Sequence, residues 1–184
     1  MGPIRYLEDD VAGLHDLCQE LVVGKTVVEL GSYWGESMVI FAQYAKRVYC
    51  IDPWVDVVES GATADGSSFH YREMTEAEAH FDVNALTVDN VIKIRGRSDD
   101  LAEVFGGNCV DIVYIDSLHH YPHVRRDINK WWRIVKPGGW LSGHNYAPYW
   151  PGVVRAVDET FKKPDKTYKD SSWAVQKKTG RRNA

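Results

Sequence analysis

Two acids and two glycines near the start of the chain have the spacing of a nucleoside-binding site. Glu29, Gly31 and Gly35 follow an apolar run, and Asp52 ends a second apolar run 21 residues after Gly31. Glycines let a turn bring its backbone close to a ligand, and an acid at the tip of the next strand can accept both hydroxyl protons of a ribose. These residues predict a ligand that contains a ribose.

The turn between the glycines narrows the choice of ligand. Tyr33 and Trp34 stand where a dinucleotide site leaves room for a pyrophosphate. Glu29 would repel a phosphate, but it suits a ligand with an ammonium and a sulfonium group. A Rossmann-type oxidoreductase is the alternative that the aromatic turn disfavours, and binding of a nicotinamide nucleotide would establish it.

Two more polar segments, 115–121 and 142–146, also follow apolar runs. The carboxyl ends of neighbouring parallel strands meet at one edge of a sheet, so we expect Asp116 to lie beside His144 and Asn145. A carboxylate, an imidazole and an amide oxygen around one point can bind a divalent cation.

The elements that must position these residues alternate along the chain. Apolar patterning predicts strands at about 26–30, 47–52, 91–95, 110–115 and 139–144, and helices at about 7–22, 36–45, 73–86, 98–105, 122–134 and 152–161. The run 173–175 is expected to add a final antiparallel strand. Strands that alternate with helices indicate an α/β fold in which helices cover both faces of a doubly wound parallel sheet.

Composition limits the number of domains, the class of partner and the location that we expect for this protein. With 184 residues, of which 44% are hydrophobic, the chain can bury one core, and we expect a single domain over 1–178 with a flexible basic tail at 179–184. The basic residues from Lys177 onward are interpreted as a solvated end. A net charge of -4 argues against a nucleic-acid partner, and no apolar run could span a membrane. Three scattered cysteines favour a reducing, cytoplasmic location.

Taken in order, these motifs resemble the class I S-adenosylmethionine-dependent methyltransferases. The first motif of that superfamily has the form acid, x, Gly, three residues, Gly, as in Glu29 to Gly35, and a Lys136-Pro137-Gly138-Gly139 turn follows its fourth strand. A narrower likeness is to small-molecule O-methyltransferases, the macrocin or sugar enzymes and their catechol-type relatives, with I-D-x-x-H-x-Y, K-P-G-G and G-H-D-Y segments. The resemblance covers about residues 26–160 and implies a Rossmann-like, mostly parallel seven-stranded sheet.

The resemblance implies that S-adenosylmethionine is the cofactor and S-adenosylhomocysteine the product. Glu29 and the glycine turn would hold the amino-acid part of the cofactor, and Asp52 the ribose. Ser98 would line the adenine, cap the helix that follows it, or do both. The full set of cofactor-binding residues expected from the likeness is Glu29, Gly31, Ser32, Tyr33, Gly35, Asp52, Pro53, Trp54, Gly96, Ser98 and Asp116.

Catalytic roles are carried over in the same way. His119 occupies the position of the general base, and an imidazole suits removal of a hydroxyl proton near neutral pH; His120 could substitute for it. Asp116, catalytic as well, would bind Mg²⁺ or Mn²⁺ together with His144 and Asn145. The relatives usually have two acids, or an acid and Asn, at the last two positions, so the site here either holds a metal weakly or binds substrate directly.

The sequence therefore predicts methyl transfer to a hydroxyl group of a sugar, polyol or phenolic small molecule, in a monomer or a homodimer that completes the pocket. A nitrogen acceptor and a non-catalytic cofactor-binding module are the alternatives. The segment 55–72 is long and polar, which is typical of a lid. His70, His80 and His123 are interpreted as structural.

Overall fold

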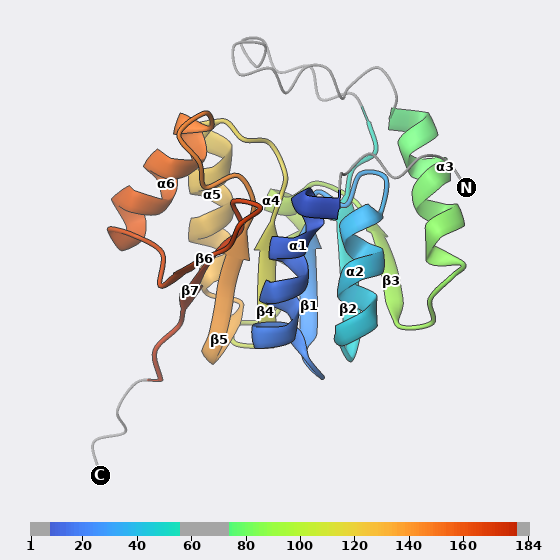
Figure 1. Cartoon of the computed structure of the whole chain (residues 1–184), viewed down its shortest axis with the longest axis horizontal. Coiled ribbons are helices and arrows are strands. Elements are labelled where there is room, and N and C mark those ends of the chain that lie inside the picture. Colours follow the sequence, from blue (N-terminus) through green and yellow to red (C-terminus); the bar gives the residue numbers. More distant parts are fainter. Residues whose placement is uncertain (1–7, 56–73, 180–184) are drawn as a thin grey trace.

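A seven-stranded sheet forms the centre of the computed structural model, which describes residues 8–55 and 74–179 (Figure 1). Its order is β3-β2-β1-β4-β5-β7-β6. The strands are β1 (Thr26–Leu30), β2 (Arg47–Asp52), β3 (Val91–Arg95), β4 (Val110–Ile115), β5 (Val135–Gly143), β6 (Lys166–Thr167) and β7 (Trp173–Gln176). Strands β1 to β5 pair in parallel, whereas β7 runs antiparallel between β5 and β6. The expected α/β class is confirmed, with a mixed sheet.

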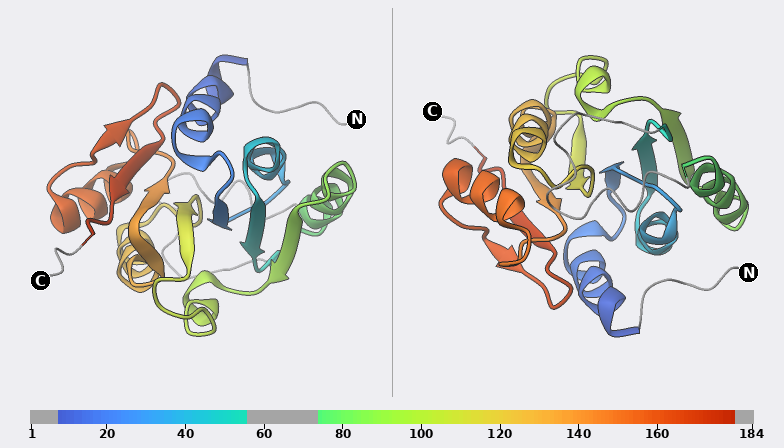
Figure 2. Two further views of the ribbon diagram at one scale, coloured as in Figure 1. Left: turned by 90° about the horizontal axis from the view of Figure 1, so that it is seen from below. Right: turned by 90° about the horizontal axis from the view of Figure 1, so that it is seen from above.

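Helices cover both faces of this sheet, as Figure 2 shows in views along the strands. One layer contains α1 (Glu8–Leu17), which continues as a π-helical turn η1 (Cys18–Val22), then α2 (Glu36–Tyr44) and α3 (Met74–Ala85). The other contains α4 (Ser98–Leu101), α5 (Tyr121–Trp132) and α6 (Pro151–Phe161). None of the helices in the described part of the chain is long and apolar enough to cross a membrane.

The two cores follow the two-residue period of the strands. Val27 and Ile112 pack under the α1–α2 layer, whereas the neighbouring residues Val28 and Val113 pack under the α5–α6 layer, and all four are fully buried. Strands that are apolar on both faces are typical of parallel sheets covered by helices. This packing fixes the carboxyl ends of β1, β2 and β4 side by side, where the functional residues lie.

Two element boundaries differ from the prediction by four residues. Helix α4 ends at Leu101 rather than near residue 105, and β5 begins at Val135 rather than near residue 139. The pairing of β4 with β5 jumps from Val110–Val135 to Ile112–Trp140, so the glycine turn forms a bulge inside the strand. Gly138 has a φ of 84°, a conformation that glycine adopts without strain.

The solvated end predicted from Lys177 onward is wrong at its first residue. The Lys177 ammonium donates hydrogen bonds of 2.8 Å to the carbonyl oxygens of Trp132 and Val135, near the end of α5. Its backbone N–H donates to the Gly139 carbonyl at 2.9 Å and thereby extends the end of β7. The predicted lid at 55–72, apart from its first residue, lies outside the described residues, as do His70, interpreted as structural, and the tail from residue 180.

Candidate functional site

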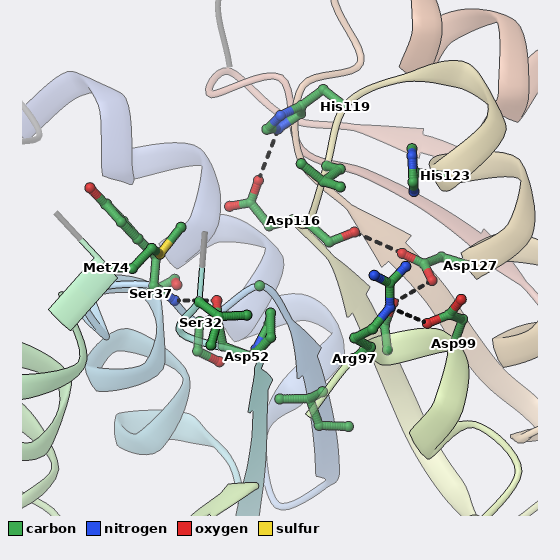
Figure 3. Close-up of a pocket in the computed structure, with 18 of the residues that line it drawn as sticks. Ser32, Ser37, Asp52, Met74, Arg97, Asp99, Asp116, His119, His123 and Asp127 are labelled. Carbon is green, nitrogen blue, oxygen red and sulfur yellow. Dashed lines mark hydrogen bonds and ion pairs between the residues drawn. The ribbon is translucent and has the colours of Figure 1, made fainter. Parts of the chain in front are cut away.

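A cavity of about 330 Å³ opens at the carboxyl ends of β1, β2 and β4 (Figure 3). Of the predicted site residues, eight line it: Gly31, Ser32, Tyr33, Asp52, Pro53, Ser98, Asp116 and His119. The wall also includes residues that the sequence did not single out, among them Ser37, Met74, Asp99, Ser117, Arg126 and Asp127. Glu29, Gly35, Trp54, Gly96, His144 and Asn145 are not part of its lining.

The turn after β1 needs its glycines. Gly31 has a φ of 90°, and a Cβ atom there would lie 2.3 Å from the carbonyl oxygen of Asp116. Gly35, at a φ of 81°, directly precedes α2, and its Cβ would lie 2.9 Å from the Phe81 ring. The first glycine thus lets the turn after β1 touch the turn after β4, whereas the second lets α2 start against α3.

Glu29 is completely buried beneath this turn. Its carboxylate accepts hydrogen bonds from the hydroxyls of Ser32 and Ser37, and both serines line the cavity. Burial raises the pKa of Glu29 to about 7, although the two serine hydroxyls act in the opposite direction. Glu29 therefore reaches the cavity through Ser32 and Ser37.

Asp52 ends β2 with its carboxylate held by backbone groups. One oxygen accepts the Tyr33 N–H at 3.0 Å and the other accepts the Trp54 N–H at 2.7 Å. Burial raises the pKa of Asp52, and these two hydrogen bonds partly offset the effect. Trp54 itself is only 2% exposed, and its indole N–H donates to the Tyr33 carbonyl, so it supports the turn from behind.

Asp116, after β4, lies between two histidines. One oxygen of its carboxylate is 3.4 Å from His119 Nε2 and 3.7 Å from His144 Nδ1. Burial alone would raise the pKa of Asp116, but the charge of His144 and the close approach of both imidazole rings hold it well below its usual range. The His119 ring stacks on Trp150 with ring centroids 4.4 Å apart.

His144 is held on both sides. Its Nε2 lies 2.6 Å from the Asp170 carbonyl oxygen, opposite the nitrogen that faces Asp116. Burial would lower the pKa of His144, but the charge of Asp116, the charge of Asp170 and the hydrogen bond to the Asp170 carbonyl raise it to about 9. Both ring nitrogens thus face oxygen acceptors, which suits the imidazolium form.

The expected magnesium or manganese site is not supported by this arrangement. Asp116 and His144 come together, but within 8–55 and 74–179 no three His, Cys, Asp or Glu side chains gather as metal ligands. Mg²⁺ prefers an octahedral shell of oxygens, and one carboxylate beside an imidazolium is a poor beginning for it. Asn145 takes a left-handed backbone conformation with a φ of 63°.

The far wall of the cavity comes from α4 and α5. Asp127 accepts hydrogen bonds from Ser98 and Ser117, and Asp99 pairs with Arg97 and Arg126. The Ser98 hydroxyl therefore does not cap its helix.

Two other predicted assignments differ from the structure. His123 was interpreted as structural, yet it lines the cavity. Gly96 was expected to bind the cofactor, but it makes room for the Leu101 side chain. The sequence signal that was missed is the spacing of His123, Arg126 and Asp127 on one face of α5.

Comparisons with known proteins agree with this fold. A family model described as "Methyltransferase domain" matches residues 28–146. An rRNA methylase from Streptococcus thermophilus is 16% identical with a TM-score of 0.58, over 89% of this chain and 85% of that one. Phosphoethanolamine N-methyltransferase 1 from Haemonchus contortus, solved with phosphoethanolamine and S-adenosylhomocysteine, is 16% identical with a TM-score of 0.55, over 77% of this chain.

A third solved structure, the YcgJ protein from Bacillus subtilis, is 18% identical with a TM-score of 0.53 over 74% of this chain. The chain spans 50% of YcgJ and 26% of the Haemonchus enzyme. No curated protein sequence matches the chain. At these identities the structural matches establish the fold.

Proposed function

The chain belongs to the methyltransferase domain family, and we propose that it binds S-adenosylmethionine and transfers the methyl group to a hydroxyl of a small-molecule acceptor. The observation that carries the proposal is the placement of His119 and Asp116 on the wall of the cavity that also contains Asp52. One wall offers a group for a ribose and the other a candidate general base.

The cofactor side of the proposal rests on the turns after β1 and β2. Asp52 is fixed by two backbone N–H groups, yet a carboxylate has about four lone-pair positions, so it can still accept the two ribose hydroxyls. The serine hydroxyls above Glu29, which line the cavity, supply polar contacts for the amino-acid part. Aromatic rings at Tyr33 and Trp34 line the same side and suit a sulfonium group.

The acceptor side rests on His119. Its Nε2 faces Asp116, so a neutral ring that donates this hydrogen keeps a lone pair on Nδ1 for the acceptor proton. In the proposed step the acceptor oxygen bonds to the methyl carbon as the carbon–sulfur bond breaks, and the hydroxyl proton passes to His119. The products are a methyl ether and S-adenosylhomocysteine. Positioning the two reactants supplies most of the acceleration, because the sulfonium is already reactive.

His144 has a supporting role in this proposal. Its imidazolium links Asp116 to the Asp170 carbonyl, which holds the carboxylate ionised and in one orientation. An ionised, oriented carboxylate is what fixes the tautomer of a catalytic histidine. No step in this scheme uses a metal ion.

The proposal is tested by calorimetric titration with S-adenosylhomocysteine, first on the native chain and then on Asp52→Asn. We expect micromolar binding, on the order of -8 kcal/mol, that weakens by at least about tenfold in the variant. Asp165→Asn is the matched control, because Asp165 accepts a backbone N–H near β7, away from the cavity. No binding to the native chain would refute the cofactor assignment, and methylation of amines but not of alcohols would refute the hydroxyl acceptor.

A further inference from the structure

Asp127 is a buried acid that the proposed reaction does not use. It lies on α5, is 3% exposed, and still forms part of the cavity wall (Figure 3). Its two oxygens each accept one hydrogen bond of 2.7 Å, from Ser98 on the turn after β3 and from Ser117 on the turn after β4. One carboxylate therefore joins two turns that are distant in the sequence.

The chemistry of these bonds fixes the direction of both hydroxyls. An ionised carboxylate can only accept hydrogen bonds, and a serine hydroxyl has one hydrogen to donate. With that hydrogen directed to Asp127, each serine oxygen has only lone pairs left for other partners. Because Ser98 and Ser117 both line the cavity, the wall presents acceptors to a ligand.

Two nearby arginines do not change the hydrogen-bonding character of this part of the wall. The guanidinium groups of Arg97 and Arg126 each lie 3.2 Å from a carboxylate oxygen of Asp99. Asp127, in contrast, accepts its two hydrogen bonds from the neutral hydroxyls of Ser98 and Ser117. The part of the wall made by Asp127 and its serines is thus suited to a ligand group that donates hydrogen bonds.

We propose that Asp127 is a positioning residue that makes the cavity select a 6-aminopurine over a 6-oxopurine. This inference rests on the proposed binding of S-adenosylmethionine, whose ribose would be held at Asp52. The base then extends from the ribose toward the turns after β3 and β4. An exocyclic amine donates to the serine oxygens, whereas an oxo group would place its lone pairs against theirs.

A purely structural role for Asp127 predicts a different result. If the carboxylate only joins α5 to the two turns, its replacement weakens the binding of all purine ligands to the same degree. If it sets the polarity of the wall, Asp127→Asn changes the preference between bases. The amide NH₂ group donates to one serine, which frees that hydroxyl hydrogen to face the cavity and to satisfy an oxo group.

The experiment compares S-adenosylhomocysteine with S-inosylhomocysteine, which has an oxo group in place of the 6-amino group, by calorimetry. For the native chain we expect the amino compound to bind about 10- to 100-fold more tightly, because a site built around one hydrogen-bond pattern rejects the analogue that reverses it. In Asp127→Asn this ratio should fall to about threefold or less. Asp165→Asn should keep the native ratio.

Two further variants test the same inference if the Asp127→Asn protein does not fold. Ser98→Ala and Ser117→Ala each remove one acceptor while the acid remains, and at least one of them should reduce the ratio. Equal affinity of the native chain for both compounds would overturn the inference, as would an unchanged ratio in a folded Asp127→Asn protein. If the native chain binds neither compound, the cofactor assignment itself fails, and that outcome is distinct from a loss of selectivity.

Discussion

Two aspartates at the ends of two parallel strands have opposite electrostatic settings. Asp52, after β2, is held by the backbone N–H groups of Tyr33 and Trp54, and burial raises its pKa. Asp116, after β4, lies between two imidazoles, and despite its burial the charge of His144 and the approach of both rings lower its pKa. Neutral dipoles suit a group that only binds a ligand. A nearby positive charge suits a group that must stay ionised beside a base.

The comparison divides the site into a binding half and a chemical half, and variants in each half should separate affinity from turnover. A variant at His119 should lower kcat with little change in cofactor affinity, whereas one at Asp52 should mainly weaken cofactor binding. Four changes test this division, in order of decreasing expected effect.

The largest effect is expected from His119→Ala. Loss of the general base should lower kcat about 10²- to 10⁴-fold, while the affinity for S-adenosylhomocysteine stays within about threefold. Turnover and calorimetry on the same protein preparation measure the two quantities. His120→Ala is the matched control, since His120 is not part of the cavity lining. A loss of turnover in His120→Ala instead of His119→Ala would assign the base to the neighbouring histidine.

The pH dependence of stability tests the charge on the β4 side. The pKa of His144 rises to about 9 on folding, so its contribution is fully present below its unfolded pKa near 6.5 and is lost as the pH rises from there to about 9. The free energy of unfolding should fall by up to about 3 kcal/mol over this range. Urea unfolding at pH 6 and pH 9 measures the fall.

His144→Gln is the variant for comparison, because it removes the titrating ring and should make the fall smaller. The fall that remains comes from Glu29, whose pKa of about 7 makes stability decrease as its carboxyl group ionises. Asp116 adds an opposite dependence at low pH, where its low pKa makes stability fall as the carboxylate is protonated. A native protein equally stable at pH 6 and pH 9 would show that His144 is neutral in the folded state.

Gly31→Ala should reduce the stability of the contact between the two halves. The new methyl group would lie 2.3 Å from the Asp116 carbonyl oxygen in a backbone conformation that disfavours side chains. We expect a loss of about 2 kcal/mol in the free energy of unfolding. Gly106→Ala is the control, because nothing lies within 4 Å of its added methyl group. Equal stability of the two variants would contradict the close approach.

The smallest effect is expected from Trp54→Phe, on the binding side. The variant keeps most of the apolar contact with Phe81 but loses the indole hydrogen bond to the Tyr33 carbonyl. The free energy of unfolding should fall by about 1 kcal/mol, and kcat should not change. A fall in kcat beyond about tenfold would mean that Trp54 acts on the chemical half as well.

Much of the fold could be predicted because strands and turns carry local signals. The ends of β1, β2 and β4 agree with the expected positions, and the glycines and acids that follow them lie where the motifs indicated. The turn with Trp54 shows the limit of such signals. Its position after Asp52 suggested a ligand contact, yet tertiary packing buries the ring against Phe81.

The wall on α5 was missed for the same physical reason. His123, Arg126 and Asp127 belong to a helix whose pattern shows only which face is apolar, and their partners come from turns far away in the sequence. The metal expectation depended on three neighbouring side chains pointing to one centre. The hydrogen bond from His144 to the Asp170 carbonyl comes from the last hairpin, which no local motif reveals.

That hydrogen bond also has a consequence for the order in which the protein matures on the ribosome. A nascent chain that has reached Tyr146 already contains the glycine turn, both aspartates and both histidines of the site. His144 still lacks its second partner, because Asp170 belongs to the segment between β6 and β7, which is synthesised later. The arrangement around Asp116 is therefore completed only when the final hairpin has been synthesised and docks on the sheet.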